Sequence, residues 1–594
     1  MFHSEGQHLS SHKGVLATLA LSICLVLLPA QAMAQFVVFP TFPVHSNATS
    51  DSGEDAFARI ATDGAGNWVA VWESDENLGG TIGPDSDILV ALSSTNGATW
   101  GAPAVLNTNA TGDTGGDFNV HIQTDGAGVW IATWESNEDV GAAISTDFDI
   151  LFSRSTNNGV TWSAPAALNT NATTDTGGDF RPLTVSAGAG VWVAVWESDD
   201  DLSGTIGTDS DILFSRSTDN GATWSAPAPL NDNAVIDTGN DGFVSVTSDG
   251  GANWVAVWES NQNLGGAIGT DIDIFVSTSS DTGATWSSTV RLNTNAATDT
   301  GNDLSPVVAT DTAGNWVVVW HSLEENVLDA FGSVINVGID SDILVSRSAD
   351  NGNSWTAPQA LNINASIDTG QDQNPVITVD SVGNWTVAWD STDDLGRTVG
   401  TDSDIFGAVS TNNGLNWTFP KAINADAATD TGFDNDEFPS IGIKGDASLV
   451  YVWHSDANLD IGGAIGTDSD ILYANAFIFF PSAEPLGGCF IATAAYGTPL
   501  DARLDALREF RDGTLLANTL GSAFVDTYYR VSPVLADRVA ENPAFAAVTR
   551  LFLTPIVALV SVFGAHPNGI AILFVCTFAS ALLLIRRRLR SLTQ

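Results

Sequence analysis

A short apolar segment with two tryptophans four positions apart recurs along the chain, and its first copy is Trp68-Val-Ala-Val-Trp72. Segments of this length and composition between polar turns are typical of β-strands. The copies begin at Trp68, Trp130, Trp192, Trp254, Trp316 and Trp385, and a degenerate seventh copy runs from Leu449 to Trp453. The spacing is 62 residues four times, then 69, then 64, and an insertion around 326–337 explains the longest step. The chain therefore contains a seven-fold repeat.

Each repeat places the same turns and strands in the same order. An Asp-Thr-Gly-x-Asp loop precedes a first strand, and a Gly-rich turn precedes the Trp strand. A long loop ending in Asp-x-Asp precedes a third strand, and a tight turn with Gly and Trp precedes a fourth. Four short strands in about 60 residues predict one blade of an all-β propeller. A β-solenoid is the alternative, although its repeats are usually shorter.

The charge of the chain is concentrated in the repeats. Residues 36–484 hold 62 acidic residues against nine Lys and Arg, whereas residues 485–594 hold seven acidic residues and ten Arg. Such an acidic body attracts cations and repels nucleic acid, so we expect no nucleic-acid partner. The 19 Trp and the 44% apolar content indicate a packed domain rather than disorder. With three Cys in the whole chain, no disulfide framework is expected.

The tight turn before the fourth strand carries a family resemblance. The segment Ser217-Thr-Asp219-Asn-Gly221-Ala-Thr-Trp224 resembles the Asp-box, or bacterial neuraminidase repeat, of sialidase-like propellers. The resemblance implies a hairpin in which Asp caps the turn, Gly adopts positive φ and Trp packs between blades, so that the box is structural. Asp stands at Asp219, Asp281 and Asp350, while Asn157, Asn412 and Thr95 replace it elsewhere; the six tryptophans are Trp100, Trp162, Trp224, Trp286, Trp355 and Trp417.

The two ends of the repeat array are predicted to share one blade. The seventh repeat has a third strand, 471–476, but no Asp-box after it. The segment 36–47 reads as the missing fourth strand, because 43–47 parallels 103–107 and ends on Asn47 as the other ends on Asn107. Its insertion would close the ring and remove the open edge. Sialidases with Asp-boxes have six blades, so a six-bladed sialidase-type propeller is the alternative to seven.

Two acidic loops of every repeat are predicted to lie on one face of the propeller. One set is Asp51/Asp55, Asp113/Asp117, Asp175/Asp179, Asp237/Asp241, Asp299/Asp303, Asp368/Asp372 and Asp430/Asp434. The other, which we predict to hold metal, is Asp85, Asp87, Asp147, Asp149, Asp209, Asp211, Asp271, Asp273, Asp340, Asp342, Asp402, Asp404, Asp468 and Asp470. Crowded carboxylates need neutralisation, and oxygen ligands at alternate positions suit Ca²⁺. Alternatively, these residues only cap turns and solvate the face.

No catalytic set is predicted from the sequence. If the chain is an exo-sialidase, as the resemblance allows, the candidate catalytic residues are Arg181, Arg59 and Tyr451. Arg181 lies in an Asp-Phe-Arg-Pro element that is similar to the family's Phe-Arg-Ile-Pro. A strongly negative face disfavours an anionic sugar. The arginines at 154, 216 and 347 recur at one repeat position, which indicates a structural role.

The ends of the chain predict export and a membrane anchor. Residues 1–34 read as a secretory signal peptide, with an uncleaved anchor as the alternative, and 35–484 as the propeller. Residues 485–544 resemble a bacterial C-terminal sorting domain with a Cys-Phe-Ile box around Cys489, which implies a helical module. Residues 545–594 contain an apolar span, 569–585, and a cytoplasmic Arg cluster. Cys489 is either a processing or lipid-attachment site or a buried thiol.

The sequence thus predicts an exported propeller held at the cell envelope by its C-terminal helix, which binds a ligand, glycan or protein partner. Envelope sorting and processing machinery is the further expected partner. A sialidase-like glycoside hydrolase and a purely structural envelope protein are the alternatives. Because the repeats look alike, the sequence does not assign the ligand to any one blade.

Overall fold

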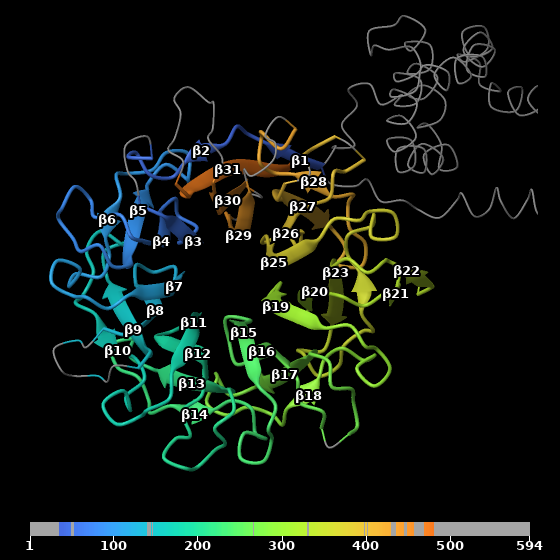
Figure 1. The fold of residues 1–594 in the computed structure, drawn as a ribbon, viewed down its shortest axis with the longest axis horizontal. Helices are drawn as coiled ribbons and strands as arrows, with labels where there is room; N and C mark the ends of the chain where they lie inside the picture. Colours follow the sequence, from blue (N-terminus) through green and yellow to red (C-terminus); the bar gives the residue numbers. More distant parts are fainter. Residues whose placement is uncertain are drawn as a thin grey trace, which may run out of the picture. The chain divides into compact units, whose positions relative to one another are not determined.

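The computed structural model describes residues 35–479, except 49–52, 139, 141–143, 145–146, 265, 330–331, 397, 401, 429–434, 445–447 and 457–467. In these residues seven antiparallel sheets are arranged as blades around a central axis (Figure 1). The predicted seven-bladed propeller is confirmed, and both the six-bladed alternative and the solenoid are wrong.

The strands at the same position in successive blades have nearly the same length. The first strands are β3 (Asp55–Thr62), β7 (Asp117–Thr124), β11 (Asp179–Gly188), β15 (Asp241–Ser248), β19 (Asp303–Thr310), β25 (Asp372–Val379) and β29 (Asp436–Ile443). The second are β4 (Trp68–Ser74), β8 (Trp130–Ser136), β12 (Val191–Ser198), β16 (Trp254–Ser260), β20 (Trp316–Ser322), β26 (Trp385–Ser391) and β30 (Ser448–Ser455). The third are β5 (Asp87–Ser93), β9 (Asp149–Ser155), β13 (Asp211–Ser217), β17 (Asp273–Ser279), β23 (Asp342–Ser348), β27 (Asp404–Ser410) and β31 (Asp470–Phe479).

The fourth strands are short. They are β6 (Ala104–Val105), β10 (Ala166–Ala167), β14 (Ala228–Pro229), β18 (Val290–Arg291), β24 (Gln359–Ala360) and β28 (Lys421–Ala422). The insertion in the fifth repeat forms a hairpin, β21 (Asn326–Leu328) and β22 (Val334–Asn336), beside β24.

The N-terminus completes the last blade, as the sequence predicts. Strand β1 (Gln35–Val38) pairs with the end of β31, and β2 (Phe42–Pro43) pairs with Leu472 and Tyr473 of the same strand. In Figure 1 these blue strands lie against the orange strands of the seventh blade. Strand β31 thus pairs with β30 along one edge and with β1 and β2 along the other, which closes the ring.

The hydrophobic core lies between blades. Side chains alternate along a strand, so Trp68 and Trp72 lie on one side of β4 and Val69 and Val71 on the other. In each blade the Trp side packs on the valine side of the preceding blade, and Trp130 and Trp134, for example, share a core with Val69 and Val71. Thirteen such tryptophans, with Trp453 of the seventh repeat among them, are at most 1% exposed. Each one removes roughly 200 Å² from water, or about 5 kcal/mol of transfer free energy.

The Asp-boxes form hairpin turns that also join blades. Asp219 accepts hydrogen bonds from the backbone N–H groups of Ala222 and Thr223 at 3.1 and 2.9 Å and from the Thr223 hydroxyl at 2.7 Å. Gly221 has φ +68°, and a Cβ built on it would lie 2.1 Å from Ile131 Cδ1 of the preceding blade. The box is therefore a structural contact, as the resemblance implies.

The recurrent arginines serve the same joint. Arg154 Nε donates to the Asn220 carbonyl at 2.6 Å, and Arg216 Nε donates to the Thr282 carbonyl at 2.9 Å. Arg154 and Arg216 thus each bind the Asp-box of the next blade, which confirms a structural role for these two, whereas Arg347 Nε is buried with no hydrogen-bond partner among the described residues.

Candidate functional site

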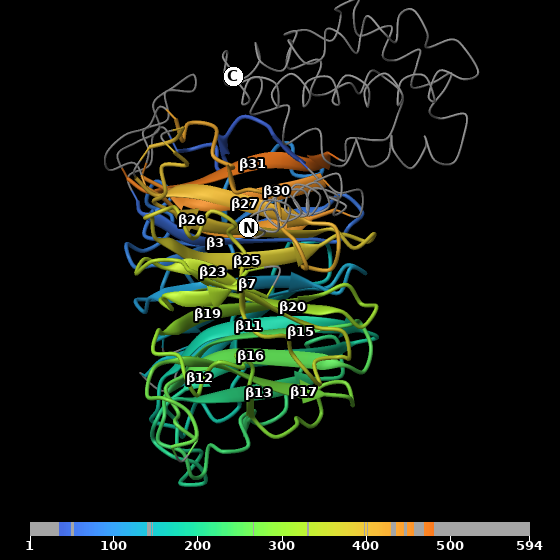
Figure 2. The ribbon, with the colours of Figure 1, turned by 90° about the vertical axis from the view of Figure 1, so that its right-hand side faces the viewer.

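The acidic loops lie on one face because of strand direction. The first and third strands of an antiparallel blade run the same way, so their N-terminal ends lie at the same face. Asp117 begins β7 and Asp87 begins β5, and Figure 2 shows the strands running across the thickness of the ring. We call this side, defined by the Asp residues that begin the first and third strands, the carboxylate face. The predicted shared face is confirmed.

At five blade interfaces, from the first–second to the fifth–sixth, one asparagine bridges the two loops. Asn107 Nδ2 donates to Asp87 Oδ1 at 2.7 Å and to Asp117 Oδ2 at 2.8 Å, while its Oδ1 accepts from Ile88 N at 3.1 Å. The same double donation recurs at Asn169, Asn231, Asn293 and Asn362. The sequence interpretation missed this role, although an Asn-x-Asn ends the fourth strand in most repeats and could have indicated it.

Predicted metal ligands come together at these interfaces with a third carboxylate from the other loop. Ligand atoms of Asp85, Asp87 and Asp113 lie within 4.8 Å of one another. The same holds for Asp209, Asp211 and Asp237, for Asp271, Asp273 and Asp299, and for Asp149 with Asp175 and Asp179. Asp147, Asp340, Asp342, Asp402 and Asp404 occupy the same repeat positions on this face.

Burial and mutual repulsion disfavour the charged forms of these carboxyls. Burial, followed by the charges of Asp113 and Asp85, raises the pKa of Asp87 to about 7, despite the hydrogen bond from Asn107. The pKa of Asp342 is raised to about 9 for the same reasons. Without a counter-charge, this face would therefore take up protons near neutral pH.

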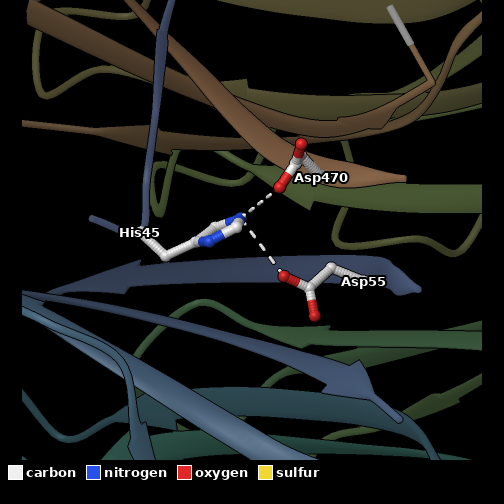
Figure 3. Close-up of side chains that lie close together, drawn as sticks. All are labelled: His45, Asp55 and Asp470. Atoms are coloured by element: carbon white, nitrogen blue, oxygen red, sulfur yellow. Dashed lines mark ion pairs between the residues drawn. The ribbon is translucent and has the colours of Figure 1, made fainter. Parts of the chain in front are cut away.

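The interface between the seventh and first blades departs from the pattern. There His45 takes the place of the bridging Asn: its Nε2 lies 3.2 Å from Asp55 Oδ2 and 3.2 Å from Asp470 Oδ1 (Figure 3). The same Nε2 accepts a hydrogen bond from Ile471 N at 3.2 Å. The predicted equivalence of Asn47 with Asn107 is thus wrong by two residues. Pro43 pairs with Leu472 as Val105 pairs with Leu89 in the first blade, so His45, two residues after Pro43, is the residue equivalent to Asn107. Asp468 lies in the same loop as Asp470.

The first strand of the seventh blade, β29, also begins later than predicted. β29 starts at Asp436, which pairs with Ser455 as Asp372 pairs with Ser391. Asp436, rather than Asp434, is therefore the strand-starting carboxylate, and the two additional residues explain the 64-residue spacing. Asp51, Asp430 and Asp434 lie outside the described residues.

A second set of carboxylates joins the blades nearer the axis. Each first strand has a bulge with a positive-φ residue after its second position, and in the third blade this is Arg181 with φ 49°. Glu73 Oε2 accepts from Asn119 N at 2.8 Å, Glu135 Oε2 from Arg181 N at 2.7 Å, Glu197 Oε2 from Phe243 N at 3.1 Å and Glu259 Oε2 from Ser305 N at 2.7 Å. Each glutamate thereby links its blade to the next.

The sialidase candidates do not form an active site. Tyr451 is fully buried in the core between the sixth and seventh blades, so it cannot reach a substrate. Arg59 lies on the first strand of the first blade, and its Nη1 donates a hydrogen bond to the Ala58 carbonyl at 3.0 Å. Arg181 is exposed, and its guanidinium pairs with Glu197 and lies 4.3 Å from the Phe243 ring centroid.

A pocket of about 430 Å³ lies on the carboxylate face between the third and fourth blades. Its lining includes Glu197, Asp209, Asn240, Phe243 and Glu259. Phe243 is 40% exposed, and at the same bulge position the first and seventh blades also carry phenylalanine, Phe57 and Phe438, whose ring centroids lie 4.8 Å apart. Among the described residues, this interface is distinguished by Arg181, the bulge residue of the third blade, whose guanidinium lies 4.3 Å from the Phe243 ring centroid.

Several predictions fall outside the described residues. The signal peptide 1–34, the sorting module 485–544 with Cys489, and the membrane segment 545–594 stay predictions. Among the residues that are described, no helix has the length and apolarity that a bilayer span requires.

Fold and site together define a seven-bladed β-propeller with Asp-box-like repeats. No family model and no curated protein matches the sequence. Among solved structures, similar chains include a protein of unknown function from Dyadobacter fermentans (12% identity, TM-score 0.41, covering 75% of this chain and 99% of that one). Others are a Hadza microbial sialidase (13%, 0.36, 76% and 98%) and a Penicillium chrysogenum α-L-arabinanase (16%, 0.35, 60% and 92%).

Proposed function

We propose that the protein is a non-catalytic binding propeller that takes an uncharged glycan in the pocket between the third and fourth blades. The observation that supports this is the exposed Phe243 ring beside carboxylates and amides in one 430 Å³ pocket. An aromatic face packs on the apolar C–H face of a sugar, and Asp, Glu and Asn side chains hydrogen-bond its hydroxyls. Carboxylates on both sides disfavour an anionic ligand.

Arg181 has a positioning role in this proposal. Its guanidinium pairs with Glu197 and lies over one face of the Phe243 ring, which stays 40% exposed, so it holds two groups of the pocket at once. A cation over an aromatic face contributes about 0.5–1 kcal/mol at an exposed site.

A glycoside hydrolase is the second candidate, and one observation favours it. Glu197 and Glu259 both line the pocket, and burial raises the pKa of Glu259 to about 7, as a general acid requires. Equivalent glutamates join other blades through the same backbone hydrogen bonds, however, which favours the structural role of this pair.

Glycan-array binding of the full-length protein, with and without calcium, tests the proposal. We expect binding to neutral glycans that falls at least ten-fold in Phe243→Ala but is unchanged in Phe148→Ala, a matched aromatic change on the second blade. Equal binding by both variants would contradict the pocket assignment. Turnover of fluorogenic sialosides or arabinofuranosides that is lost in Glu259→Gln would instead support the hydrolase.

We also propose that the propeller is exported and held at the cell envelope by the C-terminal segment. The apolar span and Arg cluster after residue 568 and the Cys-Phe-Ile box at Cys489 support this. Cell fractionation of Cys489→Ser is the test, with Cys576→Ser as control. Release of the first variant alone is expected if Cys489 is the attachment or processing site, and unchanged retention of both would contradict that role.

A further inference from the structure

We propose that five interfaces, from that between the first and second blades to that between the fifth and sixth, each bind one Ca²⁺. The ligands at each are the Asp-x-Asp pair before the third strand and an Asn and Asp four residues apart after the fourth. At the interface of the fourth and fifth blades they are Asp271, Asp273, Asn295 and Asp299. The proposal does not depend on glycan binding in the pocket.

The geometry at this interface suits a calcium ion. Ligand atoms of Asp271, Asp273 and Asp299 lie within 4.8 Å of one another. Two oxygens that each lie 2.3–2.6 Å from one Ca²⁺ can be at most about 5 Å apart, so a single ion can contact all three. The three carboxylates come from two loops, 271–273 and 295–299, which a shared ion would tie together.

Unpaired buried oxygens provide an independent observation. Asp273 is 1% and Asp299 8% exposed, yet Asp273 Oδ2 and Asp299 Oδ1 are buried with no hydrogen-bond partner among the described residues. Asp271 Oδ2 and Asn295 Oδ1 are also buried with no hydrogen-bond partner among the described residues. Buried polar atoms are normally paired, and four unpaired oxygens at one place are the arrangement that a cation satisfies.

The pattern recurs at the other interfaces. Unpaired oxygens belong to Asp85, Asp87, Asn109 and Asp113; to Asp147, Asn171 and Asp175; to Asp209, Asp211, Asn233 and Asp237; and to Asp340, Asp342, Asn364 and Asp368. In the fifth set Asn364 is 3% exposed, and its Nδ2 is turned to Asp368 and Asp393, which leaves Oδ1 for the ion.

These residues are not merely turn caps. Asp219 in the Asp-box shows what a cap does: Oδ1 accepts from two backbone N–H groups and Oδ2 from a hydroxyl. Asp273 instead accepts through Oδ1 from Asn293 at 2.6 Å and leaves Oδ2 unpaired. The alternative that the acidic loops only cap turns therefore does not account for Asp273.

Calcium is the ion that this ligand set favours. Three carboxylates and an amide are hard oxygen ligands on separate loops, and Ca²⁺ accepts six to eight of them in irregular geometry, with water in the remaining positions. Mg²⁺ requires a compact octahedron at 2.0–2.1 Å and keeps several waters, so we expect it to bind these sites weakly.

Calcium binding to the full-length protein, measured by equilibrium dialysis after removal of metal with EGTA, tests the proposal. We expect about five Ca²⁺ per chain, about four in Asp273→Asn and five in Asp219→Asn. The control is matched, because it is the same substitution in an Asp-box, where Asn stands naturally in two repeats. Asp271→Asn, at a partly exposed position, gives the same test if Asp273→Asn does not fold.

Thermal unfolding separates binding from a general loss of structure. Saturating Ca²⁺ is expected to raise the melting temperature of the wild type by roughly 10 °C over EGTA, because five ligands bind only the folded state. Asp273→Asn should melt no lower than wild type in EGTA, since it removes a buried charge, but should gain less from Ca²⁺. Absence of binding, equal stoichiometry in Asp273→Asn and Asp219→Asn, or an equal effect of Mg²⁺ would overturn the proposal.

Discussion

His45 Nε2 lies 3.2 Å from Asp470 Oδ1, and this contact joins the beginning of the propeller to its last long strand. The same nitrogen lies 3.2 Å from Asp55 Oδ2 of the first blade, so one buried side chain links the N-terminal segment to both blades at the closure (Figure 3). At five other interfaces an asparagine makes the corresponding bridge.

Replacement of His45 tests the closure. We expect His45→Ala to lower the free energy of unfolding by about 2–4 kcal/mol, because it removes the bridge between two buried carboxylates and leaves a cavity. His45→Asn introduces the residue used at the other interfaces. Its free energy of unfolding should fall by no more than half as much as that of His45→Ala. Chemical denaturation of both variants is the measurement, and equal destabilisation would mean that the bridge itself contributes nothing.

Gly221 tests the contact between an Asp-box and the preceding blade. Gly221 and Gly126 have nearly the same φ, +68° and +69°, but a Cβ on Gly221 would lie 2.1 Å from Ile131 Cδ1, whereas one on Gly126 meets nothing within 4 Å. Gly126→Ala should cost about 1 kcal/mol from backbone strain alone. Gly221→Ala should cost about 1–3 kcal/mol more through overpacking. Similar melting temperatures for the two variants would contradict close packing at this joint.

The glutamates that join blades predict a pH dependence. Burial raises the pKa of Glu73 from 4.5 to about 7, although the hydrogen bond from Asn119 N opposes the shift. A raised pKa means that the folded state holds a proton more tightly than the unfolded state, so stability is lost as pH rises from about 4.5 to 7. Glu73→Gln keeps an acceptor for Asn119 and removes the charge.

We therefore expect Glu73→Gln to have the stability of wild type near pH 5 and to exceed it by on the order of 2 kcal/mol at pH 8. Glu325→Gln, an exposed glutamate, is the control and should show no such trend. Denaturant unfolding across this pH range is the measurement. If Glu73→Gln is less stable than wild type at pH 8, the ionised carboxylate makes a net favourable contact, contrary to this prediction.

Much of the architecture could be read from the repeat. The Trp pairs, the turn residues and the missing fourth strand of the seventh repeat predict the blade count and the closure, because each depends on local patterns that the chain repeats. The register at the closure could not be read in this way. His45 differs in type from Asn107, and the match of Asn47 with Asn107 looks better in sequence than the pairing that burial and strand register impose.

The carboxylate face likewise has features that the sequence predicts and features that it does not. The order of strands places both acidic loops on one side, and the sequence indicates this directly. Which oxygens are buried, which accept a hydrogen bond and which stay unpaired depends on residues such as Asn293, twenty positions from Asp273 and ten from Asp303.

By itself, the sequence determined a seven-fold all-β repeat, its closure by the N-terminal segment and a highly acidic face. Only the tertiary structure decided that His45 is the bridging residue, that Tyr451 is buried beyond the reach of a substrate, and that Arg181 of the third blade lies over the Phe243 ring of the fourth. The physical reason is that repeats encode local strands and turns, whereas burial and pairing arise where residues of different loops and blades meet.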